Sequence, residues 1–196
     1  MHRIVLASTS PYRQALLKKL GVPFTVAKPL LDEEAAKEKL QQRGCTPLEM
    51  AQSLARLKAE SLQSEDSLVI GGDQLIQLGG HVLGKPHTDE KAVEQLMSMA
   101  GKTHEIITAV CLSTPQEKIA FHDIARLTMK PLSRAEIQDY VHLDQPLDCA
   151  GSYKIEKNGR SLFSQIEAHD FSAIEGLPLI QLASILQNLG YETKTI

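Results

Sequence analysis

Short apolar runs alternate with capped helical segments along the first half of this chain, and this alternation limits the folds open to it. Ile4–Ala7 has the length of a buried strand, and Ser10-Pro11 then supplies an N-cap and a first-turn proline for a helix ending near Leu20. Thr46–Glu49 forms a capping box with an N1 proline for a second helix, and Ser67–Ile70 follows as a second buried strand. The alternation predicts an α/β protein.

The remainder of the chain adds antiparallel and helical elements. Gly79-Gly80 separates two short runs with strand character and so predicts a hairpin between Gln74–Leu78 and His81–Leu83. The other expected elements are strands at 24–27, 105–112 and 120–129 and helices at 89–100, from 133 to about 141 and from 176 to before 190. We therefore expect a central sheet of mixed parallel and antiparallel strands, flanked by helices, in a single domain spanning residues 1–196.

Composition argues against several classes of protein. The chain has 196 residues, of which 42% are hydrophobic, and a net charge of −3, whereas a binder of polymeric nucleic acid usually shows a basic face. Cys45, Cys111 and Cys149 are far apart and fit neither a disulfide framework nor a zinc site, which suits a reducing compartment. No run has the length of a membrane span, and Met1-His2-Arg3 leads into no signal-peptide core, so we expect a cytoplasmic protein with no membrane partner.

The segment Leu6–Leu17, LASTSPYRQALL, places hydroxyl groups and an arginine at the start of a helix. The free N–H groups of a helix N-terminus bind anions, and Ser8 and Arg13 can add contacts to phosphate oxygens. The alternative is that Ser10 is only a cap and Arg13 a solvated surface residue. This segment by itself does not separate the two interpretations.

Lys58 occupies the middle of an apolar helix face made by Ala51, Leu54, Ala55 and Leu62. This position predicts that its side chain points inward and pairs with a carboxylate or another anion, because a buried ammonium group needs a partner. The alternative is a lysine at the edge of the face whose ammonium group reaches water.

Three further charged positions lie at joints between elements. Asp73 follows a buried strand, at the end where open α/β sheets place their ligands, although it can equally serve turn geometry. Glu33 lies in the acidic run Asp32–Glu34, which would otherwise be a plain acidic loop, and Lys85 is fixed between glycine and proline, where an exposed turn is the common outcome. The histidines form no i, i+4 pair, so any metal would be held by carboxylates, which suits Mg²⁺ or Mn²⁺ and a phosphate substrate.

Six segments in order resemble the motifs of the Maf family of nucleotide pyrophosphatases. They are LASTSPYRQALL, DEE at 32–34, LARLKAESL around Lys58, VIGGDQ ending at Gln74, GKP at 84–86 and EGLPL at 175–179. The resemblance runs over almost the whole chain, although the segment from Glu34 to Cys45 matches no motif firmly. It implies a mixed sheet divided between two lobes with a substrate cleft, and hydrolysis of a nucleoside triphosphate to the monophosphate and pyrophosphate. The resemblance also suggests a homodimer.

The resemblance also assigns roles to residues at matching positions. It implies Asp73 as the catalytic proton acceptor, with Lys58, Lys85 and Glu33 as further catalytic residues. It further implies Ser8 and Arg13 as phosphate-binding residues, and Glu33 with Asp73 as ligands of Mg²⁺ or Mn²⁺.

Three positions resemble the YceF-type branch of the family, which is linked to 7-methyl-GTP. They are Tyr12, Gln74 and Glu156, where relatives acting on dTTP and UTP usually carry arginine, threonine and glutamine. N7-methylated guanine is cationic, so a carboxylate at Glu156 would favour it and Tyr12 could stack on it. The alternatives are a dTTP/UTP pyrophosphatase and, because family members have been associated with arrest of septum formation, a nucleotide-binding regulator without turnover.

Overall fold

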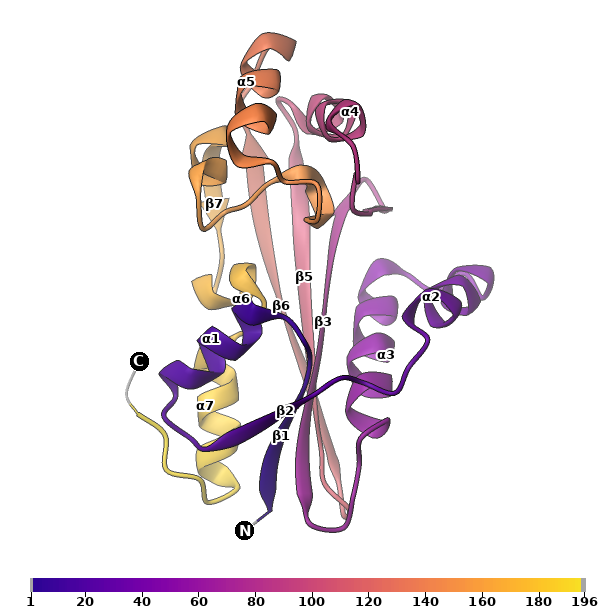
Figure 1. Cartoon of the computed structure of the whole chain (residues 1–196), viewed down its shortest axis with the longest axis vertical. Coiled ribbons are helices and arrows are strands. Elements are labelled where there is room, and N and C mark those ends of the chain that lie inside the picture. The colour runs from indigo at the N-terminus through magenta and orange to yellow at the C-terminus, as the bar shows by residue number, and fades with distance from the viewer. Residues whose placement is uncertain (1, 195–196) are drawn as a thin grey trace. The chain divides into compact units, whose positions relative to one another are not determined.

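The computed structural model of the chain describes residues 2–194 as a seven-stranded sheet with flanking helices (Figure 1). The strands are β1 (Arg3–Ala7), β2 (Phe24–Ala27), β3 (Ser67–Leu78), β4 (His81–Leu83), β5 (Thr103–Ser113), β6 (Lys118–Met129) and β7 (Phe163–Glu167). The α-helices are α1 (Pro11–Lys19), α2 (Glu33–Gln42), α3 (Pro47–Glu60), α4 (Asp89–Met99), α5 (Arg134–Asp144), α6 (Phe171–Glu175) and α7 (Leu179–Asn188), and two short 3₁₀ helices are η1 (Ala150–Ser152) and η2 (Asn158–Leu162).

The sheet is mixed, as predicted. Its strand order is β2-β1-β3-β5-β6-β7, and β4 pairs with β3. β1 runs parallel to both β2 and β3, with Leu6 opposite Val26 on one side and Ile70 on the other. β4 is antiparallel to β3, and β7 is antiparallel to β6. The helices α1 and α3 supply the connections that parallel strands need.

The chain divides into two compact units. The first unit comprises Met1–Gln74, Thr108–Asp123 and Asp170–Ile196, and the second comprises Leu75–Ile107 and Ile124–His169. Seven of the predicted site residues belong to the first unit: Ser8, Tyr12, Arg13, Glu33, Lys58, Asp73 and Gln74. Lys85 and Glu156 belong to the second unit.

Helices cover both faces of the sheet in the first unit. On one face, α1 and α7 lie side by side (Figure 1). Their leucines form one apolar core with alternate residues of β1 and β3, namely Ile4, Leu6, Leu68 and Ile70. Because strand side chains alternate between faces, the intervening residues of β3 point to the opposite face, which α3 covers.

Gly71 in β3 allows α3 to approach this face closely. A Cβ atom at this position would collide with the carbonyl oxygen of Ala55 and would lie 2.6 Å from the backbone nitrogen of Ala59. Both atoms belong to the backbone of α3, which cannot yield as a side-chain tip could. Asp73 is two residues further along β3 and therefore faces the same helix.

Gly71→Ala is expected to lower the free energy of unfolding by about 3 kcal/mol, the upper end of the usual cost of overpacking. Urea denaturation measures this loss. Gly84→Ala is the matched control, because a Cβ there meets no atom within 4 Å and the residue has no left-handed φ. Equal midpoints for the two variants would contradict the close packing of α3 on β3.

Two expected features of the first unit differ in the structure. Asp73 lies inside one continuous strand, Ser67–Leu78, and not past the end of a shorter strand as predicted. Both glycines before it are buried and take ordinary extended backbone, so the strand passes through them. The alternative interpretation of Asp32–Glu34 as a plain acidic loop is wrong, because Asp32 accepts the N–H of Ala35 and caps α2, so that Glu33 opens a helix.

The remaining elements agree with the predictions to within a few residues, apart from α2, α6, β7 and the two 3₁₀ helices, which were not predicted. Thr46 and Ser133 form the predicted capping boxes of α3 and α5. Gly79 and Gly80 both have positive φ values in the hairpin between β3 and β4, as a two-residue turn of this kind requires. Within residues 2–194, no helix combines the length and apolar character needed to cross a bilayer.

Candidate active site

A buried ion pair between α3 and β3 lies at the centre of the candidate site. The Lys58 Nζ atom is 2.6 Å from Oδ1 of Asp73, and the two side chains are only 7% and 5% exposed. The apolar face of α3 turns Lys58 toward the sheet, which confirms the prediction that it points inward. Lys58 also lies in the last turn of α3, where the helix dipole favours a positive charge.

Glu33 supplies a second carboxylate to the same ammonium group. Its Oε2 atom lies 2.9 Å from Nζ of Lys58, and its Oε1 atom lies 3.3 Å from Nζ of Lys37. Glu33 begins α2, directly after the cap at Asp32, and its side chain is 41% exposed. Lys58 therefore bridges one buried carboxylate and one that remains open to solvent.

The two carboxylates have opposite proton affinities. Burial raises the pKa of Asp73 above its ordinary value, although the positive charges of Lys58 and Arg13 oppose the shift. Burial also acts to raise the pKa of Glu33, but Lys58 and Lys37 outweigh it and hold that pKa below its ordinary value. Asp73 is therefore the better proton acceptor of the two near neutral pH, while Glu33 remains a fixed negative charge.

One oxygen of Asp73 remains for chemistry. Its Oδ1 atom accepts from Lys58, whereas its buried Oδ2 atom has no hydrogen-bond partner among residues 2–194. Burying a carboxylate oxygen without a hydrogen bond costs free energy, and such an oxygen is typical of positions that bind a proton, a cation or a water molecule.

Arg13 brings a second cation to this part of the first unit. The side chain of Ser10 caps α1 by accepting the backbone N–H of Arg13, as predicted, and Nε of Arg13 donates to the carbonyl of Gly176 at 3.1 Å. Burial lowers the pKa of Arg13, while the negative charges of Asp73 and Glu33 oppose the shift. These mutual effects place Arg13, Glu33, Lys58 and Asp73 in one electrostatic cluster, named the catalytic cluster after the role that the resemblance implies for it.

The hydroxyl residues before α1 fold onto their own backbone. Ser8 is buried, and its Oγ atom accepts the N–H of Ser10 at 3.2 Å. A hydroxyl group that accepts one hydrogen bond still carries a proton to donate, so Ser8 retains the chemistry needed for a phosphate contact. The role of Ser8 remains a prediction.

The predicted specificity residues have different environments. Tyr12 lies in the first turn of α1 with 42% of its surface exposed. The amide nitrogen of Gln74 donates to Thr108 and to the carbonyls of Ala173 and Ile174, so it is occupied within the first unit. Glu156 is exposed in a turn of the second unit.

Lys85 lies in the second unit, exposed in the loop after β4. Its catalytic role, like the base-reading roles of Tyr12, Gln74 and Glu156, stays a prediction.

Sequence reasoning missed two residues that organise the first unit. Lys37 lies one helical turn after Glu33 and pairs with it, a contact that the i, i+4 spacing signals once α2 is known to be a helix. Asp170 is buried and accepts from the backbone N–H groups of Ser172 and Ile180, so it fastens the starts of both α6 and α7. The Asp-x-Ser pattern of a helix cap was its only local signal.

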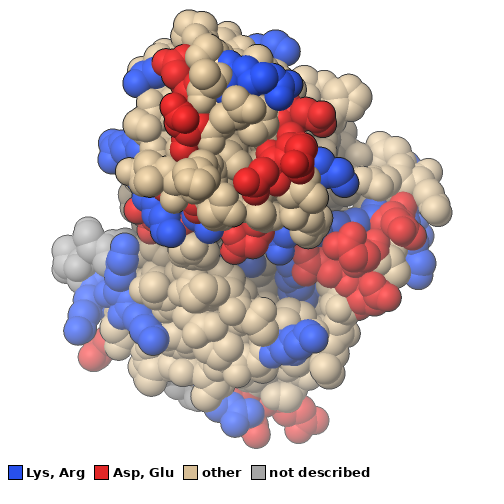
Figure 2. All heavy atoms as spheres, turned by 45° about the horizontal axis from the view of Figure 1, so that its top comes forward, with Lys and Arg blue, Asp and Glu red and all other residues tan. Residues whose placement is uncertain are grey.

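Acidic and basic side chains are interspersed on the face of the molecule that Figure 2 shows. Over α2, the acidic residues Glu33 and Glu34 both contact Lys37, at 3.3 and 3.5 Å. Lys58 and Arg13 bring two positive charges together in the catalytic cluster, which suits a small anionic ligand.

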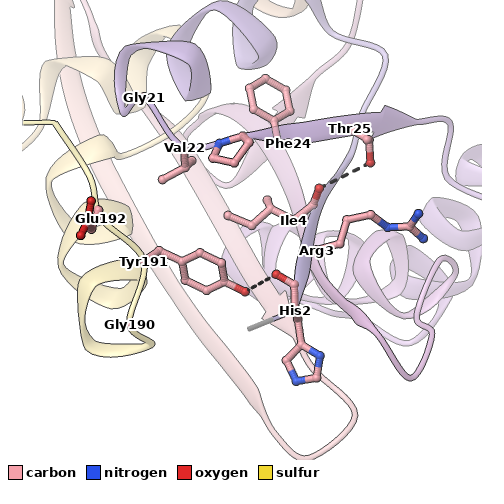
Figure 3. Close-up of a pocket in the computed structure, with 11 residues that line it drawn as sticks. His2, Arg3, Ile4, Gly21, Val22, Phe24, Thr25, Gly190, Tyr191 and Glu192 are labelled. Carbon is pink, nitrogen blue, oxygen red and sulfur yellow. Dashed lines mark hydrogen bonds between the residues drawn. The ribbon is translucent and has the colours of Figure 1, made fainter.

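A cavity of about 680 Å³ opens at the other end of the parallel strands (Figure 3). It lies beside the first residues of β1 and β2, and none of the predicted site residues lines it. The hydroxyl of Tyr191 donates to the carbonyl of His2 at 2.7 Å, and that of Thr25 donates to the carbonyl of Ile4. No residue of the catalytic cluster lines the cavity, so the two are separate.

The carboxylates of the catalytic cluster fit a hard divalent cation. Asp73 offers a buried oxygen without a hydrogen bond, and Glu33 offers a solvent-exposed carboxylate. Within residues 2–194, no three His, Cys, Asp or Glu side chains are grouped to hold a metal ion. Mg²⁺ commonly binds to one or two carboxylates and completes its shell with substrate phosphates and water. The donor chemistry therefore suits a cation that arrives with a phosphate ligand.

Comparison with known proteins gives matches over nearly the whole chain. A family model described as Maf-like protein matches residues 3–189. The chain is 53% identical over 186 residues to the 7-methyl-GTP pyrophosphatase of Bdellovibrio bacteriovorus, covering 95% of this chain and 96% of the relative. It is 40% identical over 194 residues to the 7-methyl-GTP pyrophosphatase of Xanthomonas axonopodis pv. citri, covering 98% and 99% of the two chains. It is 36% identical over 190 residues to the dTTP/UTP pyrophosphatase of Aquifex aeolicus, covering 96% of each chain.

Proposed function

Because this chain belongs to the Maf-like protein family, we propose that it is a nucleoside triphosphate pyrophosphatase and that its substrate is 7-methyl-GTP. The observation that carries the proposal is the buried contact between Lys58 and Asp73, with Glu33 on the same ammonium group. A protein that only bound nucleotides would need the cations, but it would have no need of a buried carboxylate with a raised pKa and an oxygen free of hydrogen bonds.

Asp73 acts as the proton acceptor in this proposal. Water adds across the phosphoanhydride bond between the α- and β-phosphates: its oxygen forms a new bond to phosphorus, and the bridging oxygen leaves with pyrophosphate. The proton of the water passes to Oδ2 of Asp73, while Lys58 holds Oδ1 and fixes the carboxylate.

The cations of the catalytic cluster stabilise the charge that builds on phosphate oxygens. Arg13 lies in the first turn of α1, where the helix N–H groups add to the positive potential. Its guanidinium group can bind phosphate through two parallel hydrogen bonds, whereas the ammonium group of Lys58 acts as a point charge. Both cations are preorganised by the fold, so little reorganisation is required when the negative charge develops.

A divalent cation belongs to the proposal, and the carboxylates of Glu33 and Asp73 would hold it. When bound, it would supply Lewis-acid neutralisation of the phosphates.

Treatment with EDTA is expected to lower turnover at least about tenfold, because several kcal/mol of charge stabilisation is lost, and Mg²⁺ or Mn²⁺ should restore turnover. The reaction is stopped first, and inorganic pyrophosphatase is then added with its own Mg²⁺ to measure the pyrophosphate that was released. Unchanged turnover in EDTA would remove the cation from the proposal.

Recognition of the methylated base is assigned to Glu156 and Tyr12. The carboxylate of Glu156 would attract the positive charge of 7-methylguanine, and the exposed ring of Tyr12 offers a stacking surface.

A panel of 7-methyl-GTP, GTP, dTTP and UTP tests the substrate directly. We expect 7-methyl-GTP to have the highest kcat/KM, and Glu156→Gln to reduce its advantage over GTP about tenfold, the worth of one charge interaction near 1.4 kcal/mol.

The panel also separates the alternatives. Preference for dTTP or UTP would indicate the activity named for the Aquifex relative. Release of no pyrophosphate from any nucleotide, with or without Mg²⁺ or Mn²⁺, would overturn the enzymatic proposal and leave a nucleotide-binding regulator. We further propose that the protein acts in the cytoplasm as a homodimer, and light scattering on the purified chain measures its mass in solution.

A further inference from the structure

Gln74 directs its amide away from solvent and onto the end of a helix. Its Nε2 atom lies 2.9 Å from the hydroxyl of Thr108, 2.9 Å from the carbonyl of Ala173 and 3.1 Å from the carbonyl of Ile174. Gln74 follows Asp73 in β3, so it faces the opposite side of the sheet from Lys58. These hydrogen bonds keep the amide of Gln74 turned toward the protein interior.

The hydrogen bonds of Gln74 anchor the carboxyl-terminal end of α6. This helix has only five residues, Phe171–Glu175, and cannot be stable by itself. Thr108 donates to the carbonyl of Ala173 at 2.8 Å, so β5 and β3 hold the same turn of α6. Asp170 and Ser172 bind the amide groups at the start of α7, which fixes the other side of the connection.

The connection between α6 and α7 presents a backbone carbonyl to Arg13. Gly176 ends α6, two residues after Ile174, and its carbonyl accepts from Nε of Arg13 at 3.1 Å. The φ value of Gly176 is +128°, a backbone conformation that favours glycine. Because Nε is engaged, the two terminal nitrogens of the guanidinium group are held in a fixed direction.

We infer that Gln74 is a positioning residue for Arg13: by holding α6 it fixes the Gly176 carbonyl, which orients the guanidinium group for phosphate binding. The inference rests on the proposed function in one respect, that Arg13 binds the phosphates of the ligand. It gives Gln74 a role in triphosphate binding that is independent of the nucleobase.

Inorganic triphosphate is the probe that separates this role from reading of the base, because it carries the phosphates without a nucleoside. Isothermal titration calorimetry would measure its Kd for the full chain, Gln74→Met, Arg13→Met and the double variant. We expect the Kd to rise at least about tenfold in Arg13→Met, the worth of a charge-assisted hydrogen bond, and about fivefold in Gln74→Met. The double variant should bind no more weakly than Arg13→Met, because the two residues act through one contact.

Turnover supplies a second readout with nucleotides. Gln74→Met should raise KM for 7-methyl-GTP and GTP by the same factor, leaving the ratio of their kcat/KM values unchanged. Gln63→Met is the matched control, since it removes an amide that donates to two backbone carbonyls, of Ser64 and Ser67, at the other end of β3. It should leave triphosphate binding at the wild-type level.

Thr108→Val provides an independent test if Gln74→Met fails to fold. Valine keeps the shape of the threonine side chain but removes the hydroxyl that joins Gln74 to the carbonyl of Ala173. The inference is supported if Thr108→Val raises the Kd for triphosphate in the wild-type protein but not in the Arg13→Met variant. The inference is overturned by additive effects in the double variant, by an unchanged Kd with an altered base preference, or by wild-type protein that fails to bind triphosphate. Absence of turnover with all nucleotides would overturn the proposed activity alone, because the calorimetry reads binding.

Discussion

Asp73→Asn is expected to lower kcat at least about a hundredfold while nucleotide binding is retained, the loss typical when a general base is removed. The amide nearly matches the carboxylate in shape, so packing of β3 against α3 should be preserved. Lys58 keeps Glu33 as a charged partner at 2.9 Å, which limits the cost to the buried ammonium group. Single-turnover kinetics and calorimetric titration with the nucleotide measure the two effects separately.

The pH dependence of the wild-type protein belongs to the same prediction. Burial raises the pKa of Asp73, so the carboxyl group stays protonated, and unable to accept a proton, to a higher pH than an ordinary aspartate with a pKa of about 3.9. The acid limb of kcat/KM should therefore lie above about pH 4 and should be absent from the residual activity of Asp73→Asn. Near wild-type turnover in this variant, or an unchanged acid limb, would exclude Asp73 as the proton acceptor.

Lys58→Met is expected to be inactive near neutral pH and to lose about 3 kcal/mol of unfolding free energy at pH 7, the lower end of the cost of breaking a buried ion pair. Without the ammonium group, Asp73 remains buried and loses the largest of the positive charges that oppose burial, so its pKa should rise further. The acid limb of any residual activity should move to higher pH. The loss of stability should also grow as the pH rises, because the ionised carboxylate is the form that burial penalises.

Lys118→Met is the matched control for this substitution. Lys118 pairs with Glu60 at 2.7 Å in the same unit, but its side chain is 52% exposed, and exposed pairs contribute little. Chemical denaturation at several pH values compares the two variants. A destabilisation of Lys58→Met no greater than that of Lys118→Met would show that the buried pair has no special role in stability.

Local sequence signals predicted most elements of the fold because they describe interactions between near neighbours. The capping box at Thr46 closes within four residues, and the turn at Gly79-Gly80 needs only a left-handed backbone. The same signals failed at Gly71 and Gly72, which looked like the end of a strand. The small size of Gly71 serves the close approach of α3, a requirement that no local pattern contains.

The candidate site divides in the same way. The sequence by itself determined that Lys58 lies on an apolar helix face and that Ser10 and Arg13 begin a helix, because both follow from helical periodicity and capping. Only the tertiary structure decided that one ammonium group contacts both Glu33 and Asp73, which are forty residues apart along the chain. It also showed that Gln74 turns inward to α6. Such pairings depend on which helix packs on which face of the sheet, and therefore on side-chain volumes distributed over the whole first unit.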